Sequence, residues 1–484
     1  MDNTDKRSHK PQSNAFKEFM ASGWGPRPES ATRTEVADYL PQRHKAVSEA
    51  FPDTRLVIPA GNLKVRSNDT DYRFRAHSAF SHMSGLGGEM EPDSVLVVEP
   101  DGEATLFFEP RASRSSEQFY ADHRYGEFWV GARPSIEEME VQTGLHCAPI
   151  NTLKDALSKD LGLVKLRTIR GIDVQVDETV DSVLTSASLE VNAEADAQLE
   201  QFLSEMRLCK DPFEVREMQK AVDATKAGFE QIIRELPRAI EHPRGERVIE
   251  GAFAAVAREE GNGLGYDTIA AAGNHANTLH WMDNSGQVPP DALVLVDAGV
   301  EVDSLYTADI TRTLPVSGKF SEVQARVYQA VLDAAEASLA EAARPGCRFK
   351  DLHTAAMRVL AARLEEWGFL PVSAAQSLNE GGDQHRRWMP HGTSHHLGLD
   401  VHDCAQAKDE LYREAELLPG MIFTIEPGLY FRADDLTVPE EYRGIGVRIE
   451  DDIVIEEDGT PRRLSEDIPR TIKDVEAWMR ELQA

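Results

Sequence analysis

Four carboxylate side chains interrupt otherwise apolar runs of the sequence, and they are the residues most able to do chemistry. Asp297 follows the run LVLV, and Asp309 lies inside TADITRT. Glu426 interrupts MIFTIEPG, and Glu450 interrupts VRIEDDIVI. A carboxylate is rarely buried without a partner, because removing its charge from water costs free energy. One such residue alone would indicate a group that faces water or pairs with an arginine, but four together predict a shared cation site.

Histidines cluster between these carboxylates along the chain. The segment WMPHGTSHHLGLDVHD, residues 388–403, contains four of the 15 histidines, and His385 lies just upstream. His391 and His395 have the four-residue spacing of the His-Glu-x-x-His helix of zinc peptidases. That comparison fails, because Gly392 occupies the glutamate position and the nearby proline and glycines argue against a helix.

Not every histidine of this segment can face one site. His396 directly follows His395, so in an extended chain the two side chains point in opposite directions. We therefore predict that His385 and His396 lie at the surface. Residue chemistry alone leaves the roles of His391, His395 and His402 open.

Four carboxylates with one or two imidazoles exceed the ligands that one tetrahedral zinc ion needs. They suit two divalent metal ions bridged by carboxylate oxygens, an arrangement that clamps a water molecule or hydroxide for hydrolysis. Because oxygen ligands dominate the set, it favours Mn²⁺, with Co²⁺ or Zn²⁺ as alternatives. The residue types therefore predict a hydrolase with two metal ions.

Arg448 is the basic residue best placed to act beside these carboxylates. It lies two residues before Glu450 on a predicted strand, so both side chains point to one face while Ile449 points to the other. An arginine there can orient a liganding carboxylate from behind. A plain ion pair is the alternative, and residue chemistry leaves both readings open.

Strands in the second half of the chain must position these groups. Apolar runs predict two pairs of strands, the first over residues 292–300 and 308–316. The second pair is predicted over residues 420–431 and 444–459. Helical segments alternate with these runs, so the pattern predicts an α+β domain with antiparallel strands.

Helix start signals surround these strands. Asp211, which is followed by a proline, lies three residues before Glu214 and has the N-cap and capping-box pattern of a helix. Ser321 with Gln324 repeats this pattern and predicts a second helix. A third helix is predicted over residues 350–367, where a glycine follows.

The first half of the chain predicts a separate domain, since 484 residues exceed one compact core. Residues 1–35 are polar and predict a flexible N-terminal tail. Residues 36–200 predict a smaller mixed α/β domain, with a buried strand at 55–61 and a hairpin over 94–110 around an Asp-Gly turn. A boundary near residue 200 separates it from a catalytic domain over residues 205–475.

Composition excludes several function classes. The net charge of −31 argues against nucleic-acid binding, which needs dense lysine and arginine. The four cysteines form no Cys-x-x-Cys pair, which argues against a disulfide framework and fits a reducing compartment. The polar N-terminus lacks the apolar segment of a signal peptide, and the sequence holds no run of about 20 apolar residues. We therefore predict a cytoplasmic protein that binds no membrane.

Five ordered segments of the second half resemble the metal-dependent pita-bread peptidases, the group that contains methionine aminopeptidase, prolidase and aminopeptidase P. They are VDAG, ADITRT, PHGTSHHLGLDVHD, FTIEPGLY and RGIGVRIEDDIVI. Upstream, NDTDYRFRAHSAFSHMSGLGG, residues 68–88, resembles the non-catalytic N-terminal domain of aminopeptidase P. The resemblance implies a pita-bread catalytic domain preceded by a creatinase-type N-terminal domain, and an Xaa-Pro aminopeptidase activity.

The resemblance implies a specific set of metal ligands. Carried over by position, they are Asp297, Asp309, His395, Glu426 and Glu450. Asp309 and Glu450 match the residues that bridge two divalent metal ions in the family. His395 is then the only histidine of the cluster that binds metal.

The resemblance also implies contacts with the substrate. His391 and His402 match residues that contact the substrate and stabilise the transition state, and His280 in NTLHWMDN matches a further substrate-side histidine. Arg448 and Tyr430 match groups behind the first aspartate ligand, and we predict that both also border the substrate.

In one place the sequence departs from the family pattern. Eleven residues separate Asp297 from Asp309, where ten are expected. An extra residue in the connection between two strands leaves both ligands intact but can change the rim of the site.

The implied reaction is hydrolysis of the bond between an N-terminal residue and a following proline. That bond is a tertiary amide without an N–H, so it needs a dedicated pocket. We predict that a hydroxide bridging the metal ions attacks the carbonyl carbon and that Glu426 passes the proton of the water to the proline nitrogen. His402 or His391 would hydrogen-bond the developing oxyanion, and the free α-amino group would approach the metal at Asp297 and Asp309.

The nearest alternative activity is that of a prolidase, which cleaves only Xaa-Pro dipeptides with the same ligands. The segments HGTSHHLG, VPEEYRGIGVRIED and NDTDYRF look more like aminopeptidase P. A non-catalytic peptide-binding pita-bread module is disfavoured because every ligand type is present. The resemblance also implies proline-containing peptides as substrates and assembly as a homodimer or homotetramer.

Overall fold

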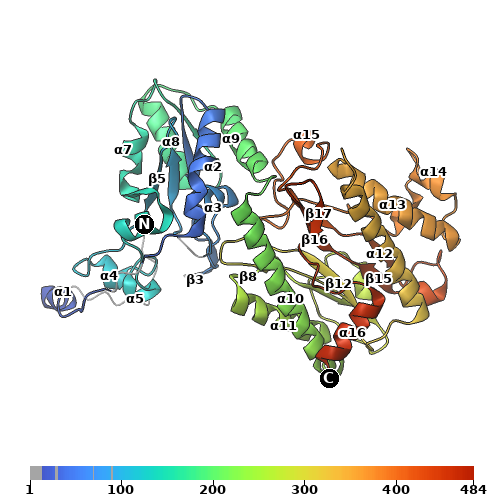
Figure 1. The fold of residues 1–484 in the computed structure, drawn as a ribbon. Helices are drawn as coiled ribbons and strands as arrows, with labels where there is room; N and C mark the ends of the chain where they lie inside the picture. Colours follow the sequence, from blue (N-terminus) through green and yellow to red (C-terminus); the bar gives the residue numbers. More distant parts are fainter. Residues whose placement is uncertain (1–12, 28–30, 69, 89–90) are drawn as a thin grey trace. The chain divides into compact units, whose positions relative to one another are not determined.

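The computed structural model describes residues 13–27, 31–68, 70–88 and 91–484, and its elements are labelled in Figure 1. The chain forms two compact units, Met1–Leu203 and Ser204–Ala484. The division falls within helix α9 (Ala193–Met206). Among the described residues, no helix combines the length and the apolar character that a bilayer span requires.

The first unit contains a mixed five-stranded sheet with the strand order β6-β5-β4-β1-β7. Its strands, with the separate short pair β2 and β3, are β1 (Thr54–Pro59), β2 (Val65–Ser67), β3 (Thr70–Asp71), β4 (Val95–Val98), β5 (Ala104–Phe108), β6 (His146–Pro149) and β7 (Lys165–Thr168). Strands β4 and β5 form the predicted hairpin, with Val98 opposite Ala104. The alternation of parallel and antiparallel neighbours agrees with the predicted mixed α/β class.

Short helices surround this sheet. They are α1 (Asn14–Met20), η1 (Glu35–Asp38), α2 (Leu40–Ala50), α3 (Ser78–Ser84), α4 (Gln118–Ala121), α5 (Glu127–Val130), α6 (Ile136–Thr143), η2 (Ile150–Thr152), α7 (Leu153–Leu157) and α8 (Val174–Ser186). Helix α8 buries Val176, Val180 and Val183 against the sheet, at the spacing of one helix face.

The stretch predicted as a flexible tail contains ordered structure where it is described. Helix α1 begins after the Ser13 cap, whose hydroxyl accepts the Phe16 N–H. The Arg27 guanidinium lies 2.6 Å from the Glu127 carboxylate, and the Trp24 ring packs edge-on against Phe119. The polar composition of the stretch gave no sign of these contacts. Residues 1–12 and 28–30 of the predicted tail lie outside the described residues.

The second unit carries long helices. They are α10 (Pro212–Glu241), α11 (Gly245–Glu260), η3 (Gly273–Asn277), α12 (Glu322–Ala342), α13 (Phe349–Glu366), α14 (Ala374–Leu378), η4 (Gln384–Arg387), α15 (Asp409–Tyr412), η5 (Glu440–Tyr442) and α16 (Ile472–Leu482). Asp211 with Glu214, and Ser321 with Gln324, form the predicted capping boxes, and α13 occupies the third predicted helix. Helix α10 pairs with α11 and α12 pairs with α13, and the two pairs flank the strands (Figure 1).

The strands of the second unit are short and mainly antiparallel. They are β8 (Gly263–Leu264), β9 (Ile269–Ala272), β10 (Leu293–Ala298), β11 (Val300–Glu301), β12 (Ile310–Pro315), β13 (Ile422–Ile425), β14 (Gly428–Phe431), β15 (Ile445–Arg448), β16 (Asp451–Ile455) and β17 (Pro461–Arg463). Strand β10 pairs with both β12 and β9, so the first predicted pair is confirmed.

The second predicted pair of strands is interrupted. Strand β13 pairs with β16 and β14 pairs with β15, with Glu426 and Glu450 in the gaps between the two ladders. Pro427 cannot donate to a ladder because it has no N–H. The Glu450 N–H instead donates to the Thr311 carbonyl of β12 at 3.1 Å. Because the ladders are interrupted at Glu426 and Glu450, the direction of these two side chains is not set by the alternation of side chains along a regular strand.

Candidate active site

A pocket of about 300 Å³ opens in the second unit. Its walls contain Leu279, His280, Asp297, Asp309, His391, Gly392, Ser394, His395, His402, Glu426, Arg448 and Glu450. These include all five predicted metal ligands and four of the five predicted substrate-contact residues. The fifth, Tyr430, lies directly behind the pocket, where its hydroxyl is 2.7 Å from the His391 Nε2.

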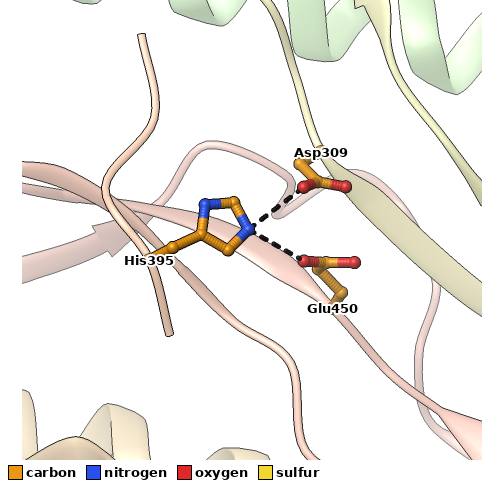
Figure 2. Close-up of side chains that lie close together, drawn as sticks. All are labelled: Asp309, His395 and Glu450. Carbon is orange, nitrogen blue, oxygen red and sulfur yellow. Dashed lines mark ion pairs between the residues drawn. The ribbon is translucent and has the colours of Figure 1, made fainter. Parts of the chain in front are cut away.

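Three of the side chains converge closely enough to share one ion. The ligand atoms of Asp309, His395 and Glu450 all lie within 4.8 Å of one another. Figure 2 shows the His395 Nε2 directed between the two carboxylates, 3.2 Å from Asp309 Oδ2 and 4.0 Å from Glu450 Oε1. Glu426 Oε1 approaches the same nitrogen at 3.6 Å. Residues next to the ends of β12, β13 and β16 thus meet around a single imidazole.

Asp297 joins this group through a residue that the sequence did not reveal. The Tyr266 hydroxyl lies 2.7 Å from Asp297 Oδ1 and 2.5 Å from Asp309 Oδ1. A phenol has one proton and donates to one acceptor at a time. Tyr266 therefore holds the two aspartates side by side, although its only sequence signal is an aromatic residue shortly before β9.

The extra residue between Asp297 and Asp309 does not separate them. The chain between them contains the turn after β11, where Leu305 adopts a φ of 72°. Strands β10 and β12 keep a regular register on either side of it, with Asp297 opposite Thr311. The eleven residues between the two aspartates therefore leave the pairing of β10 with β12 regular.

Arg448 contacts several parts of the site at once. Its Nη2 donates to Asp297 Oδ2 at 2.5 Å and its Nη1 to the Tyr430 hydroxyl at 3.1 Å. Its Nε donates to the Thr311 hydroxyl at 3.2 Å, and that hydroxyl donates to Glu450 Oε2 at 2.6 Å. Arg448 is thus an ion-pair partner and a support for two pocket carboxylates, so the two readings left open by the sequence both apply. Thr311 is a second residue that sequence reasoning missed.

The histidines reach the pocket from different directions. The His391 Nδ1 bonds the Gly392 carbonyl at 2.6 Å and lies 3.5 Å from Glu426 Oε2. The His402 ring stands edge-on to that of His395, with centroids 4.4 Å apart. His280 projects from the irregular segment that follows η3. As predicted, the segment around His391 and His395 is not helical.

The surface location predicted for His385 and His396 is wrong. His396 is fully buried, where its ring stacks on Phe349 with centroids 4.3 Å apart. His385 is also buried, with its Nδ1 2.8 Å from the Ser377 hydroxyl. The alternation of side chains along an extended chain correctly predicted that His396 points away from the pocket. That side of the chain, however, faces the core between α13 and β13.

Burial dominates the electrostatics of the carboxylates. It raises the pKa of Asp297 and of Glu450, and the negative charge of Asp309 adds to the effect. Burial likewise raises the pKa of Glu426 to about 7. Burial alone would lower the pKa of His395, but Asp309 and Glu426 raise it to about 9. A cluster of buried acids of this kind needs positive charge, so this oxygen-rich donor set fits divalent metal ions.

His391 and His402, which also line the pocket, behave differently from His395. Burial lowers the pKa of His391 to about 3, with Arg448 adding to the effect. Burial also lowers the pKa of His402, with the neighbouring His395 as the next cause. Both rings are therefore neutral near pH 7, and each offers one nitrogen that donates and one that accepts a hydrogen bond.

Comparison with known sequences agrees with this geometry. Residues 216–457 match metallopeptidase family M24, and residues 40–168 match the aminopeptidase P N-terminal domain. The chain is 48% identical to Xaa-Pro aminopeptidase 1 of Streptomyces coelicolor, over 97% of this chain and 93% of that protein. It is 30% identical to human Xaa-Pro aminopeptidase 3, over 91% and 85% of the two chains.

Solved structures show the same two-domain architecture. The chain resembles Pseudomonas aeruginosa aminopeptidase PepP with a TM-score of 0.79 and 28% identity, over 93% of this chain and 99% of that one. It resembles zinc-substituted Escherichia coli aminopeptidase P in complex with product with a TM-score of 0.80 and 29% identity, over 94% and 100%. The predicted fold, a pita-bread domain preceded by a smaller mixed α/β domain, is confirmed. The chain belongs to metallopeptidase family M24, in the branch that carries an aminopeptidase P N-terminal domain, and it is an enzyme.

Proposed function

We propose that this enzyme removes the N-terminal residue from peptides whose second residue is proline. The observation that carries the proposal is the convergence of five ligand side chains and three further histidines on one pocket. Relatives named Xaa-Pro aminopeptidase match the chain over nearly its whole length, which supports the same substrate class here.

The five ligands would hold two divalent metal ions, and Mn²⁺ suits their mainly oxygen donors best. They are Asp297, Asp309, His395, Glu426 and Glu450. Asp309 and Glu450 both face the His395 Nε2, at 3.2 and 4.0 Å, so these three side chains would hold an ion together (Figure 2). When bound, the ions supply Lewis acidity that activates water and polarises the scissile carbonyl.

Glu426 is the residue suited to proton transfer. Its carboxylate lies in the pocket wall, where a carboxylate can accept a proton and release it again. It would take the proton of the attacking water and deliver it to the proline nitrogen, which lacks a proton of its own. This delivery turns a poor leaving group into a secondary amine.

The neutral histidines would bind the rest of the substrate. His402 can donate a hydrogen bond to the carbonyl oxygen as it gains negative charge. His391 lines the same pocket, but its Nδ1–H already donates to the Gly392 carbonyl, so its ring would border the bound peptide. His280, from the irregular segment after η3, also lines the pocket and would contact the peptide. Arg448 and Tyr430 hold His391 and Asp297 in place from behind.

A peptide panel tests this function directly. The enzyme is stripped with a chelator, reloaded with Mn²⁺, Co²⁺ or Zn²⁺, and assayed on Xaa-Pro-Yaa, Xaa-Ala-Yaa and the dipeptide Xaa-Pro. We expect metal-dependent release of Xaa from Xaa-Pro-Yaa and much slower cleavage of the alanine peptide. Exclusive cleavage of the dipeptide would instead identify a prolidase.

We also propose a cytoplasmic location and assembly as a homodimer or homotetramer. All four cysteines are free thiols, which supports a reducing compartment. Light scattering on the purified protein measures the number of subunits, and fractionation of the source cells tests the location.

A further inference from the structure

The carboxylate of Glu246, near the start of α11, is fully buried and outside the pocket. Four N–H groups point at it. Oε1 lies 2.8 Å from both the Ala272 N–H and the His275 Nδ1. Oε2 accepts the Trp281 Nε1–H at 2.9 Å and the Gly286 N–H at 2.6 Å. These four bonds use the full acceptor capacity of an ionised carboxylate.

All four donors belong to one short segment, residues 272–286, which leaves β9 and returns toward β10. The segment closes around the carboxylate, and the backbone completes the closure because the Glu246 N–H donates to the Gly286 carbonyl at 3.1 Å. A Cβ on Gly286 would lie 2.6 Å from Glu246 Oε2, so only glycine permits this approach. One side chain thus sets the path of an otherwise irregular loop.

The same segment carries His280 into the pocket. His280 directly precedes Trp281, whose ring stacks on His275 with centroids 3.9 Å apart. The His275 and Trp281 rings both hydrogen-bond the Glu246 carboxylate, which lies outside the pocket. These bonds therefore fix the backbone next to His280. His280 itself is exposed, so this support from behind determines where its imidazole lies.

We propose that Glu246 is a positioning residue for the peptidase reaction: it holds the 272–286 segment so that His280 meets the substrate. The inference rests on the proposed substrate role of His280. Glu246 touches neither substrate nor metal ligand, and it acts through the Trp281 bond and the His275 stack.

Glutamine is the informative substitution. Its side chain has the same shape, but the amide offers one oxygen acceptor and one NH₂ donor group. Two of the four N–H groups would then face the NH₂ donor of the glutamine. The 272–286 segment must therefore shift, while helix α11 stays intact. Glu246→Gln should lower kcat/KM about ten- to hundred-fold, the range expected when a reacting group is displaced by about 1 Å.

The matched control is Glu214→Gln. Glu214 is also buried in the second unit, where it accepts the Tyr306 hydroxyl at 2.8 Å, and it does not line the pocket. If loss of any buried carboxylate weakened catalysis through stability alone, both variants would lose kcat/KM in proportion to their loss of melting temperature. We expect Glu214→Gln to lower the melting temperature while kcat/KM stays within about two-fold.

A double-mutant cycle separates positioning from any other effect. His280→Ala, Glu246→Gln and the double variant are loaded with Mn²⁺ and assayed on Xaa-Pro-Yaa. If Glu246 acts through His280, adding Glu246→Gln to His280→Ala lowers kcat/KM by no more than about two-fold.

Fluorine NMR reports on the segment itself. The protein is labelled with 5-fluorotryptophan at its six tryptophans, and the Trp281 resonance is assigned with Trp281→Phe. This resonance should shift in Glu246→Gln.

The outcomes are distinct. Equal losses from Glu246→Gln in both backgrounds, or an unshifted Trp281 resonance, would overturn the positioning role. Unchanged kcat/KM in His280→Ala would refute the proposed role of His280 and this inference with it. If Glu246→Gln does not fold, Trp281→Phe removes a single bond to the carboxylate and should still lower kcat/KM, and a normal value there would reject the proposal.

Discussion

The Arg448 guanidinium lies 2.5 Å from the Asp297 carboxylate, on the side of Asp297 that faces away from Tyr266. Asp297 is therefore held from two directions, by a cation through Oδ2 and by a phenol through Oδ1. Its remaining freedom is small, which is the condition for a ligand whose position must not change when a metal ion binds.

Replacing Arg448 with lysine keeps the positive charge but removes the fork of donors. Arg448→Lys cannot reach Asp297, Tyr430 and Thr311 together, because an ammonium is a single point donor. We expect Mn²⁺ affinity to fall by about 10- to 100-fold. Isothermal titration of the chelator-treated protein measures this, and equal affinity in variant and parent would show that the fork is dispensable.

Loss of Glu450 should remove both metal binding and activity. Glu450→Ala leaves the Thr311 hydroxyl without its acceptor and the His395 imidazole without one of its acidic neighbours. We expect no detectable turnover of Xaa-Pro-Yaa and less than one metal ion per subunit by elemental analysis. Turnover by this variant after treatment with a chelator would contradict the assignment of the site.

Tyr266 offers a milder test of the same centre. Tyr266→Phe keeps the ring and removes only the hydroxyl that bonds Asp297 and Asp309. We expect Mn²⁺ to bind about ten-fold more weakly while the fold is retained. Circular dichroism checks the fold, and restoration of kcat by excess Mn²⁺ would place the defect in metal binding rather than in chemistry.

Asp451 should stabilise the second unit in a pH-dependent way. Burial opposes its ionisation, but Arg312, Arg463 and Arg470 outweigh burial and hold the pKa of Asp451 well below its usual range. Its stabilisation is therefore fully present above the unfolded pKa of about 3.9 and is lost as the pH falls further. Asp451→Asn should cost about 3–5 kcal/mol at pH 7, since it leaves the buried Arg312 without its carboxylate partner.

Denaturant unfolding at several pH values measures this difference. The deficit of Asp451→Asn should be constant from pH 7 to about pH 5. It should narrow below about pH 4, where Asp451 of the unfolded parent takes up a proton while the folded parent still holds the charge. A deficit that is unchanged at low pH would mean that Asp451 acts through packing rather than through its charge.

The strands and the carboxylates that line the pocket were predictable because each carries a local signal. Asp297 and Asp309 interrupt apolar runs, and the two runs pair in the structure. The capping boxes at Asp211 and Ser321 were equally visible, since a helix start is encoded within four residues.

Groups that depend on distant partners were not predictable. Tyr266 bonds residues 31 and 43 positions away, and Thr311 bonds a glutamate 139 positions away. Glu246 lies in the first turn of α11, where acidic residues are common, so no local signal marks its role. His396 was predicted at the surface but is buried. The alternation of side chains along an extended chain predicts the direction of a side chain, but it does not predict whether protein or water lies in that direction.

The separation between Thr311 and Glu450 also bears on how the enzyme is made. Strand β12 leaves the ribosome long before the segment that supplies Glu450 is synthesised, and the Glu450 N–H and side chain both bond Thr311. The metal-binding pocket therefore cannot be complete on a nascent chain that ends before residue 450. A chain truncated before residue 450 should therefore hydrolyse no peptide.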